Sequence, residues 1–326
     1  MELINPTPLP AQLYIGELDP LAPGSKRILL VVAKATFREG AEGFYLDTES
    51  PFPLYQTDTR TPLGILPRDD LPKYNAGVDL IVIGKAHAPK AVTSMKVSFQ
   101  IGKNFRRDLL VFGERKWEKR GEGFKPSSPL EFSEMPLSHE VAYGGRTKVK
   151  IGGDMEVEVS YPLNPEGKGF VLQEEEVEGT PLPNLENPNE PILNWEDHPT
   201  PVFWSAVEPH TVLHMQRALE YEEGAWSITS RVFSRAHPEL TLPAFPFGEE
   251  VSLWGLTPDG RWGWRLPFMD VKARFNQGGG SKIFDLSPDA LVIMPEERSY
   301  YICYRSIIIY PYSPEGKTIS LFLEKV

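Results

Sequence analysis

Two histidines, His210 and His214, have the spacing that comes nearest to a catalytic pattern in this sequence. They stand four residues apart in "HTVLH", so on a helix both imidazoles would face one side, as in the zinc motif of metalloproteases. That motif carries its general base directly after the first histidine, and here Thr211 occupies this position. A zinc site also needs a third ligand, which Glu208 or Glu220 could supply, and hydrogen bonds that orient the ligands. We therefore expect no metal ion, and stoichiometric zinc would support an enzyme instead.

Two glycine-rich stretches, "YPLNPEGKGF" (161–170) and "NQGGGSK" (276–282), invite comparison with phosphate-binding loops. Such a loop needs two glycines at a fixed distance, followed by Lys and a hydroxyl residue, so that backbone N–H groups converge on the anion. The first stretch places Gly169 directly after Lys168, and the second also lacks the spacing. Asn164 instead starts the pattern Asn-Pro-x-Gly, which is typical of a type I turn. We expect a fixed turn at 161–170, a flexible tip at 276–282 and no cofactor.

Other patterns for catalysis or sugar binding are weaker. The sequence has no G-x-S-x-G stretch, which excludes the usual α/β-hydrolase nucleophile. A pair of carboxylates for glycoside hydrolysis needs only to converge in space, so a β-sandwich hydrolase that acts on cell-wall sugars stays open as an alternative. Trp254, Trp262 and Trp264 suggest a carbohydrate-binding module as a further alternative. Rings of this size more often fill a core.

The charge distribution argues against a general nucleic-acid binder. The chain has a net charge of −11, which would repel phosphate. Residues 85–125 run against this trend, with 11 Lys and Arg against 4 Asp and Glu. This stretch is either the solvated face of a hairpin or a surface for an acidic partner. Its basic residues include Lys96, Lys103, Arg106, Arg107, Arg115, Lys116, Lys119 and Arg120.

The elements that would position these side chains are mostly short strands, because 32 prolines and 27 glycines interrupt the chain. Apolar runs at 27–39 and 79–89 predict strands covered on both faces. Strict alternation from Met95 to Ile101 predicts one arm of a hairpin over 93–117. Further strands are expected at 249–256, 261–267, 289–295, 299–312 and 318–326.

One helix is expected, over 207–224. Pro209 suits its first turn, Val212, Met215 and Leu219 share a face at helical spacing, and Gly224 would end it.

The fold class is therefore mainly β, an antiparallel sandwich or meander with one or two short helices. We expect an N-terminal β lobe (1–125), a loop-rich segment packed on the core (126–200) and a C-terminal helix-plus-β lobe (201–326). Apolar side chains anchor the middle segment: Tyr143, Tyr161, Phe170, Leu182, Leu185, Ile192 and Trp195.

The single cysteine, Cys303, lies in an apolar run and is expected to be a buried thiol. The N-terminus lacks the pattern of a secretory signal, and no apolar run reaches the ~20 residues of a membrane helix. We expect a soluble, cytoplasmic protein without membrane insertion.

Five stretches occur in a particular order: "HEVAYGGRT" (139–147), "YPLNPEGKGF" (161–170), "LPNLENP" (182–188), "FPFGEEVSLWGLTPDGRWGWRLP" (245–267) and "DALVIMPEERSYYICYRSIII" (289–309). Together they resemble the bacterial family of domain of unknown function 2169, over nearly the whole chain. The positions that match are Ala142, Tyr143, Gly144, Gly145, Asn164, Pro165, Gly167, Gly169, Leu182, Pro183, Asn184 and Glu186.

The resemblance implies a non-enzymatic adaptor or chaperone of type VI secretion, which binds an effector and helps to mount it on the spike. Its partners would be a secreted effector and a spike-tip protein, with no nucleic acid and no cofactor. The matching residues carry no chemical role in this expectation and would form a framework that shapes a binding surface. The stretch 202–231 departs from the family pattern, so it is a candidate for cargo choice.

Overall fold

The computed structural model describes residues 1–17, 27–71, 77–152, 155–208, 211–215, 219–222, 225–228, 233–277, 280–310 and 317–324. The expected mainly β class is confirmed, because nearly all elements are strands. The helical elements in this part of the chain are α1 (Val212–Met215) and four short 3-10 turns, at His139–Val141, Glu174–Glu176, Pro238–Leu240 and Pro295–Glu297. No helix among these residues is long and apolar enough to cross a membrane.

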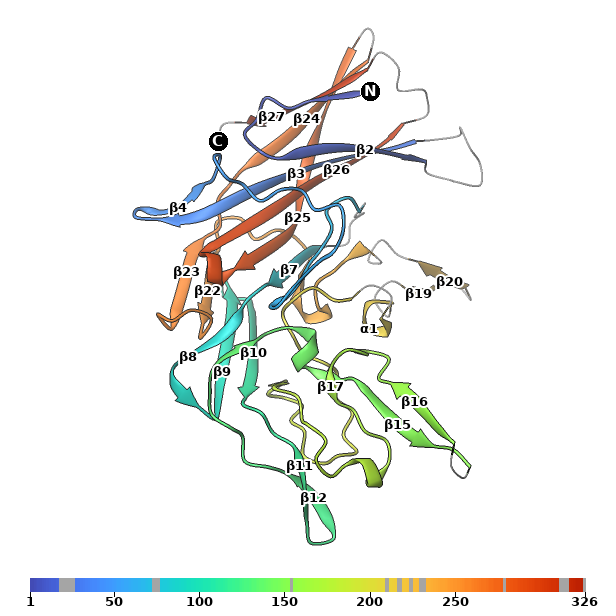
Figure 1. The fold of residues 1–326 in the computed structure, drawn as a ribbon. Coiled ribbons are helices and arrows are strands. Elements are labelled where there is room, and N and C mark those ends of the chain that lie inside the picture. The colour runs from blue at the N-terminus through green and yellow to red at the C-terminus, as the bar shows by residue number, and fades with distance from the viewer. Residues whose placement is uncertain are drawn as a thin grey trace.

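The largest sheet forms one end of the molecule (Figure 1). Its strands follow the order β1 (Glu2–Ile4), β27 (Thr318–Glu324), β24 (Asp270–Gln277), β25 (Gly280–Met294), β26 (Ser299–Tyr310), β3 (Arg27–Gly40) and β2 (Ala11–Glu17). Strands β4 (Gly43–Leu46), β7 (Val78–Val82) and β21 (Thr241–Leu242) extend it. Because β1 also contacts β2, the sheet is nearly closed into a barrel.

Pairing in this sheet is mixed. Strands β24, β25 and β26 form an antiparallel meander, as expected, whereas β1 with β27 and β7 with β25 pair in parallel. Strand β3 lies between β2, which like β3 comes from the N-terminal third of the chain, and β26, which comes from the C-terminal third. Strands of the expected N-terminal and C-terminal lobes therefore share one sheet and one core.

A second sheet lies beside the barrel-like sheet. Its order is β18 (Leu185–Glu186), β10 (Phe105–Phe112), β9 (Ser94–Ile101), β22 (Glu250–Trp254) and β23 (Arg261–Arg265). The hairpin predicted from the alternation is confirmed, with Val97, Phe99 and Ile101 buried. The rings of Trp262 and Trp264 are buried against Phe44 and Tyr300, as core residues. These two rings offer no exposed platform for a sugar, whereas Trp254 is half-buried, with the guanidinium groups of Arg106 and Arg261 over its ring.

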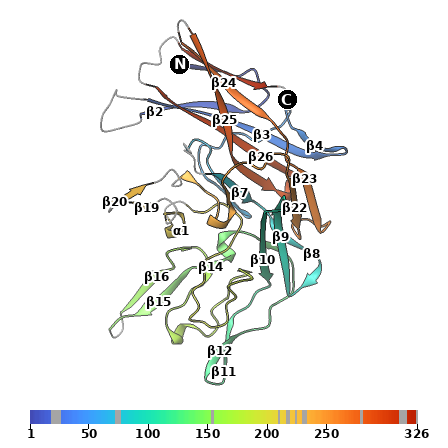
Figure 2. The same ribbon diagram turned by 180° about the vertical axis from the view of Figure 1, so that it is seen from behind.

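The other strands pair two by two. They are β5 (Thr59–Thr61) with β6 (Gly64–Leu66), β8 (Lys85–Val92) with β13 (Phe132–Pro136), β11 (Trp117–Arg120) with β12 (Gly123–Pro126), β14 (Tyr143–Gly144) with β17 (Lys168–Gly169), β15 (Arg146–Lys150) with β16 (Glu156–Ser160), and β19 (Leu219–Glu222) with β20 (Ala225–Ile228). The β11–β12 and β15–β16 hairpins lie at the end opposite the barrel-like sheet in both ribbon views (Figure 2).

The helix predicted over 207–224 is wrong in extent. Helix α1 has four residues, and the chain then forms the β19–β20 hairpin; Pro209 and Gly224 lie outside the described residues. Leu213 and His214 are buried, while Val212, on the predicted apolar face, is 41% exposed. Tertiary packing therefore determines which side chains of this segment are buried, and it overrides the apolar face that the sequence predicts.

The loop-rich middle segment has a small core of its own. Trp117 and buried aromatic and aliphatic residues from 143 to 192 form it, and Trp195 packs against it. Most of the expected anchors lie in this small core, and Leu185 lies in the main core. The members of the small core are Trp117, Tyr143, Tyr161, Phe170, Val171, Val177, Leu182 and Ile192.

Candidate functional site

The first three of the five ordered stretches meet in one place. Strand β14, which carries Tyr143 and Gly144, pairs in parallel with β17, which carries Gly169. A parallel bridge joins Ala142 to Leu185, so the third stretch lies against the first. We call this set, residues 139–147, 161–170 and 182–188, the motif knot.

Asn164 joins the first and second stretches of the knot by hydrogen bonds. Its buried side-chain amide donates to the carbonyl oxygens of His139, at 2.8 Å, and Tyr143, at 3.0 Å. Its own carbonyl oxygen accepts from the N–H groups of Gly145, at 2.8 Å, and Gly167, at 3.3 Å. The bond from Gly167 confirms the turn predicted from Asn-Pro-x-Gly. An asparagine is needed because only a side-chain amide can supply two donors in this position.

Two glycines of the knot are required by close backbone approach. A Cβ on Gly144, whose φ is +144°, would overlap the carbonyl oxygen of Asn164. A Cβ on Gly167 would lie 2.6 Å from the carbonyl oxygen of Ala142. The glycines that resemble a phosphate loop therefore serve to bring peptide groups together.

The third stretch fixes the knot to the second sheet. Asn184 is fully buried. Its backbone N–H donates to the carbonyl oxygen of Val141 at 2.9 Å, and its side-chain amide donates to the carbonyl oxygen of Phe112 at 3.0 Å. Arg115 donates to Glu186 and to the carbonyl oxygen of Pro183, and its guanidinium lies over the Phe112 ring.

The expectation that the basic residues of 85–125 lie mainly on an outer face holds for Lys96, Arg106 and Arg120, whose side chains are exposed. It is wrong for Arg115, which is 8% exposed and paired with Glu186 inside the protein. A buried ion pair between residues 71 positions apart leaves no local signal in the sequence.

Substituting Glu186 by glutamine should lower the free energy of unfolding by about 2 kcal/mol, because the amide oxygen can still accept from Arg115 but no longer balances its buried positive charge. Glutamine has the same shape, so the effect reports the charge of Arg115. Urea denaturation measures it, with Glu114→Gln as the control: Glu114 pairs with Lys168 at 3.0 Å and is exposed, so its loss should cost less than about 1 kcal/mol. Equal effects of the two substitutions would contradict the role given to Glu186.

His139 and Glu166 of the knot and Glu208 outside it each offer one ligand atom within 4.8 Å of the others. Arg60 lies among them: it donates to Glu166 at 2.7 Å and forms an ion pair with Glu208. The hydrogen bond from Arg60 lowers the pKa of Glu166 below its usual range. A metal ion would have to displace this guanidinium. The group is therefore an ion-pair network that ties β5 to the knot.

Of the two histidines considered from the sequence as zinc ligands, His214 is buried on α1 and His210 lies outside the described residues. The expectation that they hold no metal ion therefore stays a prediction.

The other two ordered stretches meet at a different place, where the largest sheet divides. Strand β25 pairs with β24 up to Leu286, and from Ser287 onward with β26. Strand β26 pairs with β25 as far as Arg305 and continues to Tyr310 with β3 as its strand partner. We call this division, at Ser287 and Arg305, the fork.

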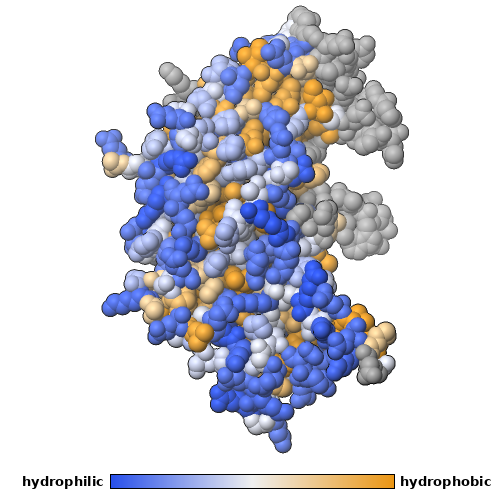
Figure 3. All heavy atoms as spheres, in the orientation of Figure 1, coloured by the Kyte–Doolittle hydropathy of each residue, from blue (hydrophilic) through white to orange (hydrophobic). Residues whose placement is uncertain are grey.

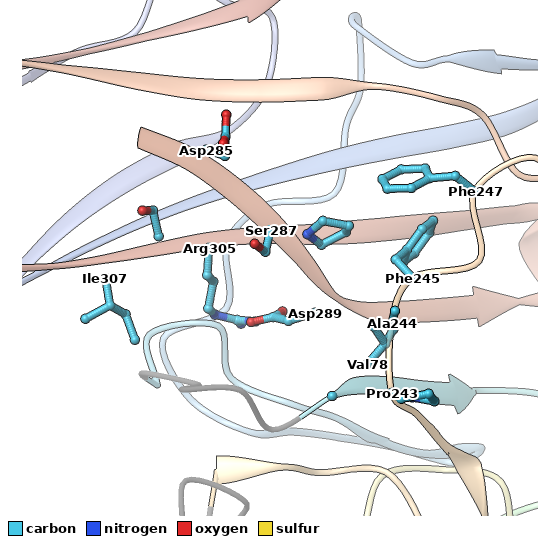
Figure 4. Close-up of a pocket in the computed structure, with 13 residues that line it drawn as sticks. Val78, Pro243, Ala244, Phe245, Phe247, Asp285, Ser287, Asp289, Arg305 and Ile307 are labelled. Carbon is cyan, nitrogen blue, oxygen red and sulfur yellow. The ribbon is translucent and has the colours of Figure 1, made fainter. Parts of the chain in front are cut away.

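A cavity of about 670 Å³ opens at the fork (Figure 4). Phe245 and Phe247 stand on one side, Ile307 on the other, and the paired side chains of Asp289 and Arg305 lie between them. Phe245 and Phe247 come from the fourth ordered stretch, and Asp289, Arg305 and Ile307 come from the fifth. Asp285 and Ser287 of β25 also line the cavity.

The floor of the cavity belongs to a buried network of charges. Arg305 forms an ion pair with Asp289 and donates to the carbonyl oxygen of Asp69 at 3.0 and 3.2 Å. The Asp69 carboxylate pairs with Lys34 at 2.6 Å. Two positive and two negative groups thus balance one another, which is the condition for burying them.

Cys303 completes this network, since its thiol donates to Asp69 at 3.2 Å. Burial raises the pKa of this thiol far above its ordinary value. The expectation of a buried, unreactive cysteine is consistent with this setting.

The sequence thus identified the knot residues as matches to the family pattern, but it did not predict which of them contact one another. It singled out none of the cavity residues for chemistry. One signal was available: Pro288 interrupts a strand, and Asp289 is the extra residue of a β-bulge there. Prolines and bulges within strands mark places where pairing ends or a side chain is redirected.

Comparison with known proteins gives one match. No curated protein and no solved structure matches the chain. A family model described as "uncharacterized protein conserved in bacteria", domain of unknown function 2169, matches residues 24–305, which include the knot and nearly all of the fork. The chain belongs to this bacterial family.

Proposed function

We propose that this protein is a non-enzymatic adaptor that binds a type VI secretion effector and helps to load it onto the spike. The family's association with type VI secretion motivates the proposal. The observation that carries it is the fork, where two strands lose their mutual pairing beside a cavity.

The arms of the fork are suited to holding another polypeptide. Residues 280–286 of β25 have β24 as their one strand partner, and residues 306–310 of β26 have β3, within the described part of the chain. Each arm thus has an edge whose N–H and C=O groups are open to an added strand. Ile283 and Ile309, one on each arm, are both 51% exposed. Strand addition gives affinity through the backbone and requires no turnover.

Apolar side chains are also exposed on other strands of the same sheet. Ile4 of β1 is 45% exposed and Ile15 of β2 is 44% exposed. Figure 3 shows apolar residues gathered at the upper end of the molecule, over the barrel-like sheet, while hydrophilic residues dominate the lower end. A surface of this kind can cover apolar segments of a cargo.

The alternative of a sugar hydrolase is less well supported by the cavity. Asp285 and Asp289 both line it, and a glycosidase needs two carboxyl groups. One of them must be protonated to act as the acid. Both carboxylates already have a cationic partner, because Asp289 pairs with buried Arg305 and Asp285 pairs with Lys272. A hydrolase would need one of them released from its partner.

Affinity capture from the native bacterium tests the proposal. The tagged protein, at its natural expression level and with secretion active, should recover one dominant effector or spike protein by mass spectrometry. Deleting the gene should abolish secretion of that effector and leave others unchanged. Recovery of neither kind of partner would contradict the proposal. Hydrolysis of purified peptidoglycan by the protein, or stoichiometric zinc in elemental analysis, would favour the enzyme.

A further inference from the structure

We propose that the cavity at the fork binds a lysine or arginine side chain, presented by an extended segment of the partner that pairs with the open edge of β26. The inference rests on the proposed function for the source of this segment, a protein cargo or spike. It adds the chemistry that the segment must carry.

The first support is an incompletely satisfied carboxylate. Asp289 is only 7% exposed and lines the cavity. Its Oδ1 accepts from Arg305, whereas its Oδ2 is buried and has no hydrogen-bond partner among the described residues. Buried polar atoms are nearly always paired, so this acceptor beside the cavity is available to a donor that a ligand brings.

The second support is charge. Asp285, on the cavity wall, adds a second carboxylate, which is exposed and lies 3.7 Å from the ammonium of Lys272. The guanidinium of Arg305 is already engaged by Asp289 and by the Asp69 carbonyl, so it is a poor receptor for an anion. A cationic donor is therefore preferred over a neutral one or an anion.

The third support is the shape and lining of the cavity. Phe245, Phe247, Pro288 and Ile307 supply apolar walls. Lysine and arginine side chains have an apolar stem and a charged tip, and they pack well where the walls are apolar and the far end is charged. Aromatic rings add attraction for a cation near their faces. The volume of about 670 Å³ is ample for one such side chain.

The register of β26 connects the open edge with the cavity. Arg305 and Ile307 are two residues apart, so they point to the same face of the sheet, and both line the cavity. Directly opposed residues on adjacent strands also share a face. A residue of an added strand that lies opposite Ile307 would therefore direct its side chain toward the cavity. The next residues along that strand would point away from it.

Peptide display on the full-length protein tests this inference. A library of random short peptides is selected on the wild-type chain, and the enriched peptides are labelled for fluorescence anisotropy. We expect enrichment of extended, β-branched peptides with Lys or Arg at one fixed position. Replacing that residue by norleucine should weaken binding at least about tenfold.

Variants of the protein locate the binding site. Asp289→Asn and Asp285→Lys should each weaken the selected peptides at least about tenfold. Asp285 is exposed, so its variant keeps the test valid even if Asp289→Asn folds poorly. Asp259→Asn is the control, since Asp259 is an exposed carboxylate on the β22–β23 turn, and it should bind as the wild type does.

Enriched peptides without a basic residue, equal binding to Asp285→Lys and wild type, or failure to enrich any peptide would each overturn the inference. Capture from the native bacterium separates it from the proposed function. If wild type and Asp285→Lys recover the same effector equally, the adaptor role stands and the cavity assignment fails. If wild type recovers no effector or spike protein, the adaptor role itself fails.

Discussion

Replacing Asp69 by asparagine should lower the free energy of unfolding by about 3–5 kcal/mol, the cost of breaking a buried ion pair by removing one partner. Asp69 is 2% exposed and Lys34 is fully buried. The Lys34 ammonium lies 2.6 Å from the Asp69 carboxylate and 4.2 Å from the centroids of the Tyr55 and Tyr301 rings. Without the carboxylate, this positive charge stays buried with neutral partners, such as the carbonyl of Pro53 and the ring faces.

Asparagine keeps the size of the side chain and can still accept from the N–H of Tyr55, so the loss reports charge. The adjacent Asp70 provides a matched control. It pairs with Arg68, whose side chain is 38% exposed, and Asp70→Asn should cost less than about 1 kcal/mol. Guanidinium chloride denaturation followed by tryptophan fluorescence measures both variants.

A compensating substitution tests the cause. Lys34→Met combined with Asp69→Asn removes both members of the pair and leaves a side chain of similar length in the core. It should be more stable than Asp69→Asn alone, because the uncompensated charge has gone. If the double variant is less stable than the single one, the cost of Asp69→Asn does not arise from Lys34.

Local sequence patterns predicted those parts of the fold that depend on near neighbours. The alternation from Met95 to Ile101 predicted the β9–β10 hairpin, and Asn-Pro-x-Gly predicted the turn closed by Asn164 and Gly167. The apolar run at 27–39 predicted β3, which is buried on both faces. In each case the determinants lie within a few residues of one another.

The parts that could not be predicted depend on residues far apart in the chain. Lys34 and Asp69 are 35 positions apart, and Arg115 reaches Glu186 across 71. A charged residue in the sequence is most often exposed, so the pattern alone favoured a solvated face for Arg115. The helix prediction failed for a related reason: packing against residues distant in the sequence, and not the local helical pattern, determines that Leu213 and His214 are buried.

The five ordered stretches acquire separate roles from this arrangement. Three of them form the motif knot, where side-chain amides and glycines hold backbone segments together. The fifth runs through the fork, where strand edges stay open, and the fourth lines the cavity there with Phe245 and Phe247. The stretches that resemble the family thus supply a rigid support, the knot, and a surface capable of binding at the fork. We expect that substitutions can disturb one without the other.

Replacing Gly144 by alanine is expected to disrupt the knot, with a loss of at least about 3 kcal/mol in its local stability. Two costs add. The φ of +144° is unfavourable for any residue with a Cβ, and that Cβ would overlap the carbonyl oxygen of Asn164. Moving this oxygen would break its bonds to the N–H groups of Gly145 and Gly167, which close the turn and join it to the first stretch.

Gly43→Ala separates the two costs. Gly43 has a φ of +115°, and a Cβ there meets no atom within 4 Å, so this variant has the backbone strain without the collision. It should lose about 1–2 kcal/mol. Hydrogen exchange followed by mass spectrometry should show faster exchange over 139–188 in Gly144→Ala, with β3 and β26 still protected, because those strands lie in the main core and most buried apolar residues of the knot lie in the smaller one. Equal losses in the two variants would mean that close approach to Asn164 contributes nothing, and uniform exchange over all strands would mean that the knot does not unfold separately from the barrel-like sheet.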